Sequence, residues 1–177
     1  PKDVKGTASM TYTHKIGDDD QWLYLPALKR VKRISSSNKS GPFMGSEFAF
    51  EDLSSQEVEK YSHKYIGLVK LKGIVCYKLE RVPVAKTSGY KTITVYINKA
   101  NLRPEAIIFF DRKGSKLKTL TYSKYNQYLG KYWRADEMKM INHQNGKETL
   151  LKFSNYKFNN SEITAESFTQ NSLKRAK

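Results

Sequence analysis

The sequence predicts a mainly β fold, in which a curled antiparallel sheet forms an incomplete, half-open barrel with short helices as a lid. Apolar and polar residues alternate with a period of two over most of the chain, which is typical of half-buried strands. Turn residues separate these runs at short intervals, and helical periodicity is scarce. Because sheets twist, a row of long strands joined by tight turns curls toward a barrel.

The predicted strands follow one another along the chain. Residues 5–14 form the first, a turn at residues 17–20 follows it, and the second covers residues 21–26. A cationic strand comes next, at residues 28–34. The longer strands are expected at residues 74–82, 89–98, 104–111, 116–127, 132–143 and 148–158.

Turns and helices complete the expected order of elements. Residues 111–114 and the dipeptide Asn145-Gly146 predict hairpin turns, because Asn-Gly tolerates the positive φ angles that such turns require. Ser54 stands three residues before Glu57, and this capping-box pattern predicts a short helix through Lys60 or Tyr61. The tail at residues 164–176 is expected to form one or two short turns against the sheet.

The chain length is that of one domain. A chain of 177 residues can build one hydrophobic core, so we expect residues 1–177 to be a single domain. The chain opens at Pro1 and soon enters a strand, and we therefore expect it to lack N-terminal elements of the full-length protein. The single Cys76 excludes an internal disulfide and is expected to be a buried thiol in an apolar strand.

The charge is strongly positive but dispersed. Lys and Arg number 32 against 17 Asp and Glu, a net charge of +15. The cations mostly alternate with apolar residues, as on the solvent face of strands, and no RNA-recognition signature, zinc finger or basic recognition helix is present. We therefore expect no nucleic acid partner, and favour attraction to anionic lipid headgroups or another acidic surface. No apolar run reaches the roughly 18 residues of a membrane span.

Catalytic and metal-binding patterns are absent from the sequence. His14, His63 and His143 are scattered without paired metal-ligand spacing. The acidic triplet at residues 18–20 is interpreted as a solvated turn, because a calcium loop alternates its ligands. The serine run at residues 35–37 lacks the flanking glycines of a nucleophile elbow. We expect no metal, no cofactor and no enzymatic activity.

Aromatic and aliphatic residues are in excess on one side of the predicted sheet. They could simply form the core, because an antiparallel sheet commonly has one apolar face. We favour an apolar cavity for a lipid or acyl chain, because so little helix is available to fill the interior. The cavity candidates are Trp22, Tyr24, Phe43, Met44, Phe48, Val75, Tyr77, Leu79, Val95, Ile97, Ile107, Phe109, Leu120, Tyr122, Met138 and Met140.

Several stretches together resemble the bacterial outer-membrane lipoprotein-sorting protein family, which is similar to the LolA and LolB lipoprotein carriers. These stretches are Asp20-Gln21-Trp22-Leu23-Tyr24-Leu25-Pro26, Arg33-Ile34-Ser35-Ser36-Ser37-Asn38-Lys39, Phe43-Met44-Gly45-Ser46-Glu47-Phe48, Phe50-Glu51-Asp52-Leu53 and Tyr128-Leu129-Gly130-Lys131-Tyr132-Trp133. Trp22, Tyr24 and Pro26 match the carriers' Trp-x-Tyr-x-Pro strand, and Phe43 with Met44 matches the segment that leads to the lid. The front of the family pattern is absent, and the lid region is short and polar.

The resemblance implies a non-enzymatic carrier in the periplasm of a Gram-negative bacterium, exported by a signal peptide that is absent from this chain. It would hold lipoprotein acyl chains or another lipid for transfer toward the outer membrane, with an inner-membrane exporter or an outer-membrane acceptor as partner. Arg30, Lys32 and Arg33 would then lie near the cavity mouth or outside the strand, and contact an anionic headgroup or an acidic partner.

Two other classes of function stay open. A periplasmic protein-interaction module, or an accessory subunit of an export system, could use the same half-barrel to bind protein, and co-purified lipid would separate these alternatives. An enzyme acting on a lipid or an envelope polymer would need an acid and a base that converge inside the cavity.

Overall fold

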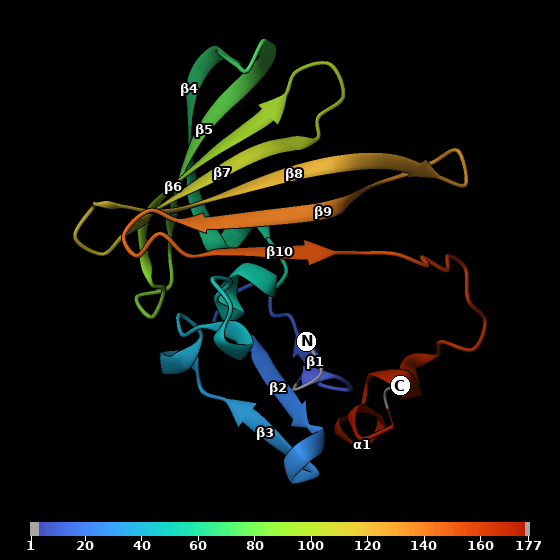
Figure 1. Cartoon of the computed structure of the whole chain (residues 1–177). Helices are drawn as coiled ribbons and strands as arrows, with labels where there is room; N and C mark the ends of the chain where they lie inside the picture. The colour runs from blue at the N-terminus through green and yellow to red at the C-terminus, as the bar shows by residue number, and fades with distance from the viewer. Residues whose placement is uncertain (1–3, 176–177) are drawn as a thin grey trace.

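The structure is a computed structural model that describes residues 4–175, and within them the strands form two antiparallel sheets (Figure 1). The small sheet has the order β1 (Ala8–Tyr12), β2 (Asp20–Leu25), β3 (Arg30–Ile34). The large, seven-stranded sheet consists, in order from edge to edge, of β4 (Tyr61–Leu71), β5 (Ile74–Pro83), β6 (Tyr90–Asn98), β7 (Pro104–Asp111), β8 (Lys116–Tyr128), β9 (Tyr132–Asn142) and β10 (Glu148–Lys152). Neither sheet closes into a barrel, so the predicted half-open, mainly β fold class is confirmed.

Most predicted strands agree with the structure to within one or two residues at their ends. One strand was missed, because β4 presents exposed residues on both faces and therefore lacks a clean apolar alternation. The last strand ends at Lys152 rather than at residue 158, and the chain then leaves the sheet. Cys76 is fully buried in β5, as expected.

The predicted helix at residues 54–60 is wrong. The chain there is extended at Ser54 and Glu57, and a short 3-10 helix, η6 (Val58–Lys60), leads into β4. Ser55 Oγ donates to the Glu57 carboxylate (2.7 Å), so a local side-chain contact takes the place of the expected helical cap.

One face of the large sheet, called the inner face here, carries the main core. Its cross-strand neighbours run Leu79, Val95, Ile107, Leu120 and Met140 from β5 to β9. The core is completed by residues 43–53, the cover segment, which contains the 3-10 helices η4 (Phe43–Gly45) and η5 (Phe50–Leu53). Phe48 of this segment is 0% exposed among the inner-face residues. The cover segment therefore packs directly on the inner face of the sheet, in the place where a lid was expected.

The small sheet has its own apolar cluster. Met10 and Trp22 pack against Leu173 of α1 (Gln170–Leu173), which follows the 3-10 helix η7 (Ala165–Phe168). Figure 1 shows the chain running from β10 past the end of the large sheet and returning to place α1 beside β1. The short turns predicted for the C-terminal tail are confirmed for the described residues; residue 176 lies outside them.

Candidate functional site

The inner face of the large sheet divides into a closed half and an open half. The strands converge above the cover segment and fan out at their other ends (Figure 1). In the closed half, Phe48 and Tyr90 pack against Ile93 and Phe109, all of them buried. In the open half, Tyr65 and Leu68 of β4 stand opposite Leu79 and Tyr77 of β5. Tyr65 is 57% exposed and Leu68 is 49% exposed, so apolar surface is available there for a ligand.

The cavity candidates from the sequence are divided among three places. Those buried in the closed half are Phe48, Val95, Ile107, Phe109, Leu120 and Met140. Those half-buried or exposed on the inner face around this core are Val75, Tyr77, Leu79, Ile97, Tyr122 and Met138. Phe43 and Met44 lie in η4 of the cover segment, where Phe43 packs against the core, and Trp22 and Tyr24 lie in the small sheet. The inner-face candidates thus share one surface, whereas Trp22 and Tyr24 belong to the separate small-sheet cluster.

The three cations expected at the cavity mouth lie elsewhere. Arg30, Lys32 and Arg33 are exposed on β3, the strand of the small sheet farthest from the large sheet in Figure 1. Arg33 pairs with Asp20 of the neighbouring β2. These cations therefore do not line the inner face, and their contact with a headgroup or partner stays a prediction.

Four inner-face residues escaped the sequence reasoning. Tyr61, Tyr65 and Leu68 belong to the missed strand β4. Arg81 follows Tyr77 and Leu79 at two-residue spacing on β5, so strand alternation alone could have placed it on the inner face. Its guanidinium lies 4.6 Å from the centre of the Tyr61 ring. Burial raises the pKa of the nearby Tyr122 to about 12, so this phenol stays neutral and can donate a hydrogen bond.

An aromatic cluster borders the fanned end of the large sheet. Tyr128 and Tyr132, on either side of the β8–β9 turn, pack against Tyr156 and Phe158 of the chain that follows β10. The rings of Tyr132 and Phe158 stack with centres 5.0 Å apart. The alternation at residues 153–158 therefore reflects this ring packing and not a continued strand.

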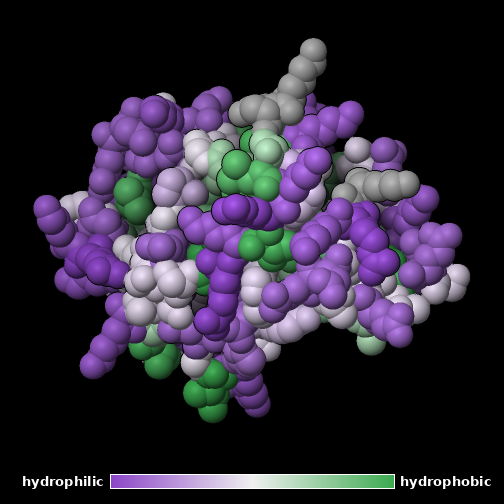
Figure 2. Space-filling view, turned by 90° about the horizontal axis from the view of Figure 1, so that it is seen from below, coloured by the Kyte–Doolittle hydropathy of each residue, from purple (hydrophilic) through white to green (hydrophobic). Residues whose placement is uncertain are grey.

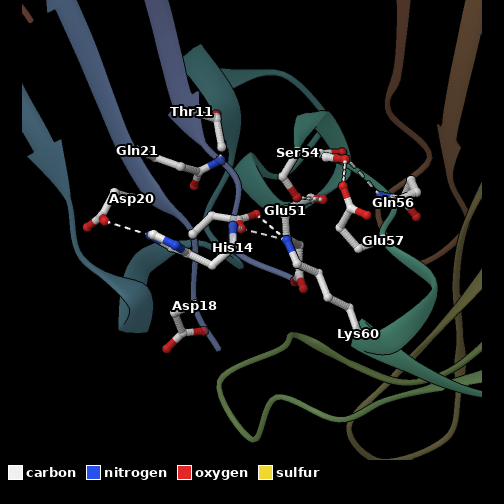
Figure 3. A network of polar contacts seen from close by, with 12 residues as sticks. Thr11, His14, Asp18, Asp20, Gln21, Glu51, Ser54, Gln56, Glu57 and Lys60 are labelled. Carbon is white, nitrogen blue, oxygen red and sulfur yellow. Dashed lines mark hydrogen bonds and ion pairs between the residues drawn. The ribbon is translucent and has the colours of Figure 1, made fainter. Parts of the chain in front are cut away.

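A polar cleft of about 470 Å³ separates the hairpin turn of the small sheet from the large sheet. Asp19 receives two hydrogen bonds from Lys60 (2.5 and 2.6 Å), and Asp18 pairs with Lys39 (2.6 Å). The predicted turn between the first two strands is present and Asp18 is exposed, but Asp19 is only 10% exposed and is engaged by Lys60 rather than by solvent. Asp19 ties the small sheet to the segment before β4, and Asp18 also accepts from Thr87 Oγ1 (3.2 Å) in the loop between β5 and β6. Figure 3 shows part of the polar network around them.

Two adjacent carboxylates belong to the cover segment, and of these Glu51 lines the cleft. Glu51 accepts hydrogen bonds from Ser88 Oγ (2.8 Å) and from the Gly89 N–H (2.9 Å), and burial raises its pKa. Asp52 pairs with Lys118 (2.6 Å) and accepts from the Tyr90 hydroxyl (2.7 Å). Both carboxylates are thus engaged in holding the cover segment against the large sheet.

The remaining surface is polar. Seen from below in Figure 2, the molecule is largely hydrophilic, and hydrophobic residues reach the surface in small separate patches. Within residues 4–175, no helix has the length and hydropathy needed to cross a membrane. The same residues contain no group of three or more His, Cys, Asp or Glu that could hold a metal ion.

Comparison with known proteins decides the family. A family model described as an uncharacterized protein matches residues 1–175. A solved domain from Vibrio parahaemolyticus, provisionally described as an outer membrane lipoprotein-sorting protein domain, is 55% identical; the match covers 99% of this chain and 74% of that one, with a TM-score of 0.94. The chain belongs to the outer-membrane lipoprotein-sorting protein family.

Two further solved structures are similar to this chain. A DUF1329 family protein from Desulfovibrio piger is 30% identical, covering 98% of this chain and 73% of that one, with a TM-score of 0.89. A LolA superfamily protein from Nitrosomonas europaea is 21% identical, covering 86% and 67%, with a TM-score of 0.69. This last likeness shows a shared LolA-like fold. No curated protein matches the chain.

Proposed function

We propose that this protein is a non-enzymatic periplasmic carrier that holds lipoprotein acyl chains, or another lipid, on the open half of the inner face for transfer toward the outer membrane. The observation that carries the proposal is the row of exposed and half-buried apolar residues there, Leu68, Tyr77 and Ile97, on neighbouring strands. The family's lipoprotein-sorting relative supports the lipid as the ligand class.

Binding of this kind needs no chemical reaction, because burial of the acyl chain supplies the free energy. Each buried methylene contributes about 0.8 kcal/mol, so covering part of one acyl chain gives usable affinity while still allowing release. Met138, half-buried beside Tyr122, can adapt its flexible side chain to different acyl chains. An inner-membrane exporter as donor and an outer-membrane acceptor are the partners that this function requires.

A matched pair of substitutions on β4 tests the proposal. Leu68 lies on the inner face and is 49% exposed, whereas Ile66 is 46% exposed and lies with Lys78 and Phe110 on the opposite face. Leu68→Gln should weaken binding of a fluorescent fatty acid about five- to tenfold, because it removes the apolar surface of one side chain. Ile66→Gln should leave the affinity unchanged.

Two outcomes would count against the lipid site. Equal effects of the two substitutions would show that the probe does not distinguish the inner face from the outer face. Absence of bound lipid in protein purified gently from membranes, with a co-purified protein in its place, would instead favour a protein-interaction module.

A further inference from the structure

Arg81 is a cation on the apolar inner face that has no anionic partner. It stands opposite Ile93 on β6 and His63 on β4, with its guanidinium over the Tyr61 ring. Its Nε is buried and makes no hydrogen bond in the described structure. Among residues 4–175, no carboxylate lies within ion-pair distance of Arg81 either.

Unlike Arg81, the well-buried lysines of this fold have anionic partners. The side chains of Lys118, Lys60 and Lys39 are at most 16% exposed, and each forms an ion pair of 2.5 to 2.6 Å with an aspartate. Glu51 and Asp52, the carboxylates near Tyr61, are already engaged by Ser88, Gly89 and Lys118. These two acids are therefore committed to other partners.

The chemistry of an unpaired guanidinium points to an anion. The Nε–H of Arg81 is a buried donor without a partner, although the residue as a whole is half-buried. An unsatisfied buried donor is costly, and a ligand that accepts from it recovers that cost on binding. The planar guanidinium presents paired N–H donors that match the two oxygens of a carboxylate or phosphate. The phenol groups of Tyr61 and Tyr122 lie near enough to influence Arg81 electrostatically. The Tyr61 hydroxyl donates to Gln56 (3.4 Å), so Tyr122 is the phenol that can add a hydroxyl donor for an anion at Arg81.

We infer that Arg81 binds the anionic group, a carboxylate or a phosphate, of a lipid whose acyl chain lies on the open half. The inference rests on the proposed lipid-binding function and adds a headgroup preference to it. Arg81 lies close enough to the open half for this, because Tyr77, Leu79 and Arg81 follow one another at two-residue spacing on the same face of β5. The acyl chain would extend from Arg81 toward the fanned end of the sheet.

Ligands with one chain length and different headgroups test this directly. Dodecanoate, dodecyl phosphate and dodecanol carry the same twelve-carbon chain, so titration calorimetry below their micellar concentrations isolates the headgroup. Wild-type protein should bind the two anions at least about tenfold more tightly than dodecanol, the typical range for a charge-assisted hydrogen-bonded pair. Inorganic phosphate alone should bind far more weakly than dodecyl phosphate.

Arg81→Gln should abolish the headgroup preference while keeping the affinity for dodecanol, which also shows that the variant is folded. Arg81→Lys keeps the charge without the planar donors and should give an intermediate preference, which tests the inference even if Arg81→Gln does not fold. Arg103 provides the matched control, because its guanidinium lies 4.1 Å from the centre of the Trp133 ring and its Nε is also buried without a partner. It differs from Arg81 in position: neighbouring strand residues point to opposite faces, so Trp133 lies on the face opposite to that of Tyr132. Arg103→Gln should leave the preference intact.

The possible failures can be told apart. Equal wild-type affinity for dodecanol and the two anions, or a preference that survives in Arg81→Gln, overturns the inference and leaves the lipid carrier intact. Binding of inorganic phosphate as tight as that of dodecyl phosphate overturns the lipid as the source of the anion. Failure of all three twelve-carbon ligands to bind overturns the proposed function itself.

Discussion

At the scale of single residues, the ion pair between Lys118 and Asp52 is the most consequential feature of the closed half. The two side chains are 5% and 1% exposed, and the Lys118 ammonium also donates to the carbonyl of Glu47 (3.0 Å). A lysine on an otherwise apolar strand face is thus matched by a single acid of the cover segment. The pair fixes where that segment sits on the sheet.

Asp52→Asn should destabilise the protein by about 3 to 5 kcal/mol, because it leaves the Lys118 charge buried without compensation. Urea unfolding followed by circular dichroism measures the change. Lys139→Met is the control, since Lys139 and Glu148 form an exposed pair, and its loss should cost less than about 1 kcal/mol. Equal costs for the two substitutions would show that the Lys118–Asp52 pair has no special role.

Glu51 gives stability a pH dependence of its own. Burial raises the pKa of Glu51 in the folded protein above the ordinary value of 4.5, so the folded state binds this proton more tightly than the unfolded state does. The contribution of Glu51 to stability is therefore greatest below pH 4.5 and is lost as the pH rises through the raised pKa. Glu51→Gln, which keeps an acceptor for Ser88 and Gly89, removes this dependence.

The free energy of unfolding of Glu51→Gln, relative to wild type, should accordingly increase from pH 4.5 upward and level off above the raised pKa. Urea titrations at pH 4 to 8 on both proteins measure this difference. A difference that stays constant over the whole range would contradict the raised pKa.

At the scale of elements, the cover segment and the loop between β5 and β6 meet at Gly89. A Cβ added there would lie 2.8 Å from the Ser40 Cβ and 3.0 Å from the Glu51 carboxylate. Gly89→Ala should therefore cost about 1 to 3 kcal/mol, as overpacking does. Adding Ser40→Gly removes the closer contact and should recover part of the loss; thermal unfolding of the two variants, compared with wild type, tests this. No recovery would show that Ser40 is not the obstacle.

The order of strands could be predicted from the sequence because it follows from alternation and turns. The residues of β7 were predicted at their observed ends, 104 and 111, since the strand is apolar within and bounded by turn residues. β4 could not be predicted in the same way, because Tyr65, Ile66 and Leu68 leave apolar residues exposed on both faces of an edge strand. The short helix at residues 54–60 failed because a capping pattern without an apolar stripe does not stabilise a helix.

The candidate site was predicted less well than the fold, for a physical reason. Alternation assigns Val95, Ile107 and Leu120 to one face, and the structure agrees. It does not say which part of that face another segment covers, and Phe48 turns out to fill the closed half. Long-range packing of this kind, like the two-sheet division that separates Trp22 from the inner face, leaves no periodic signal in the chain.

At the scale of the whole molecule, ion pairs and hydrogen bonds across the polar cleft hold the two sheets together. Apolar surface stays open at the fanned end of the larger sheet (Figure 1). The contacts across the cleft include the Asp19–Lys60 pair, whose side chains are 10% and 15% exposed. The cover segment closes one half of the inner face and leaves the other half free. The proposed acyl-chain site is the consequence of that division.

The measurement that tests this claim most directly is photocrosslinking with a diazirine-bearing fatty acid, followed by peptide mapping of the labelled protein. The account predicts labels on the inner-face positions of β4, β5 and β6, at Leu68, Tyr77 and Ile97. It also predicts that dodecanoate competes for them. Labels confined to the small sheet or to the outer face around Lys78 and Phe110, or labelling no greater than that of the unfolded chain, would contradict it.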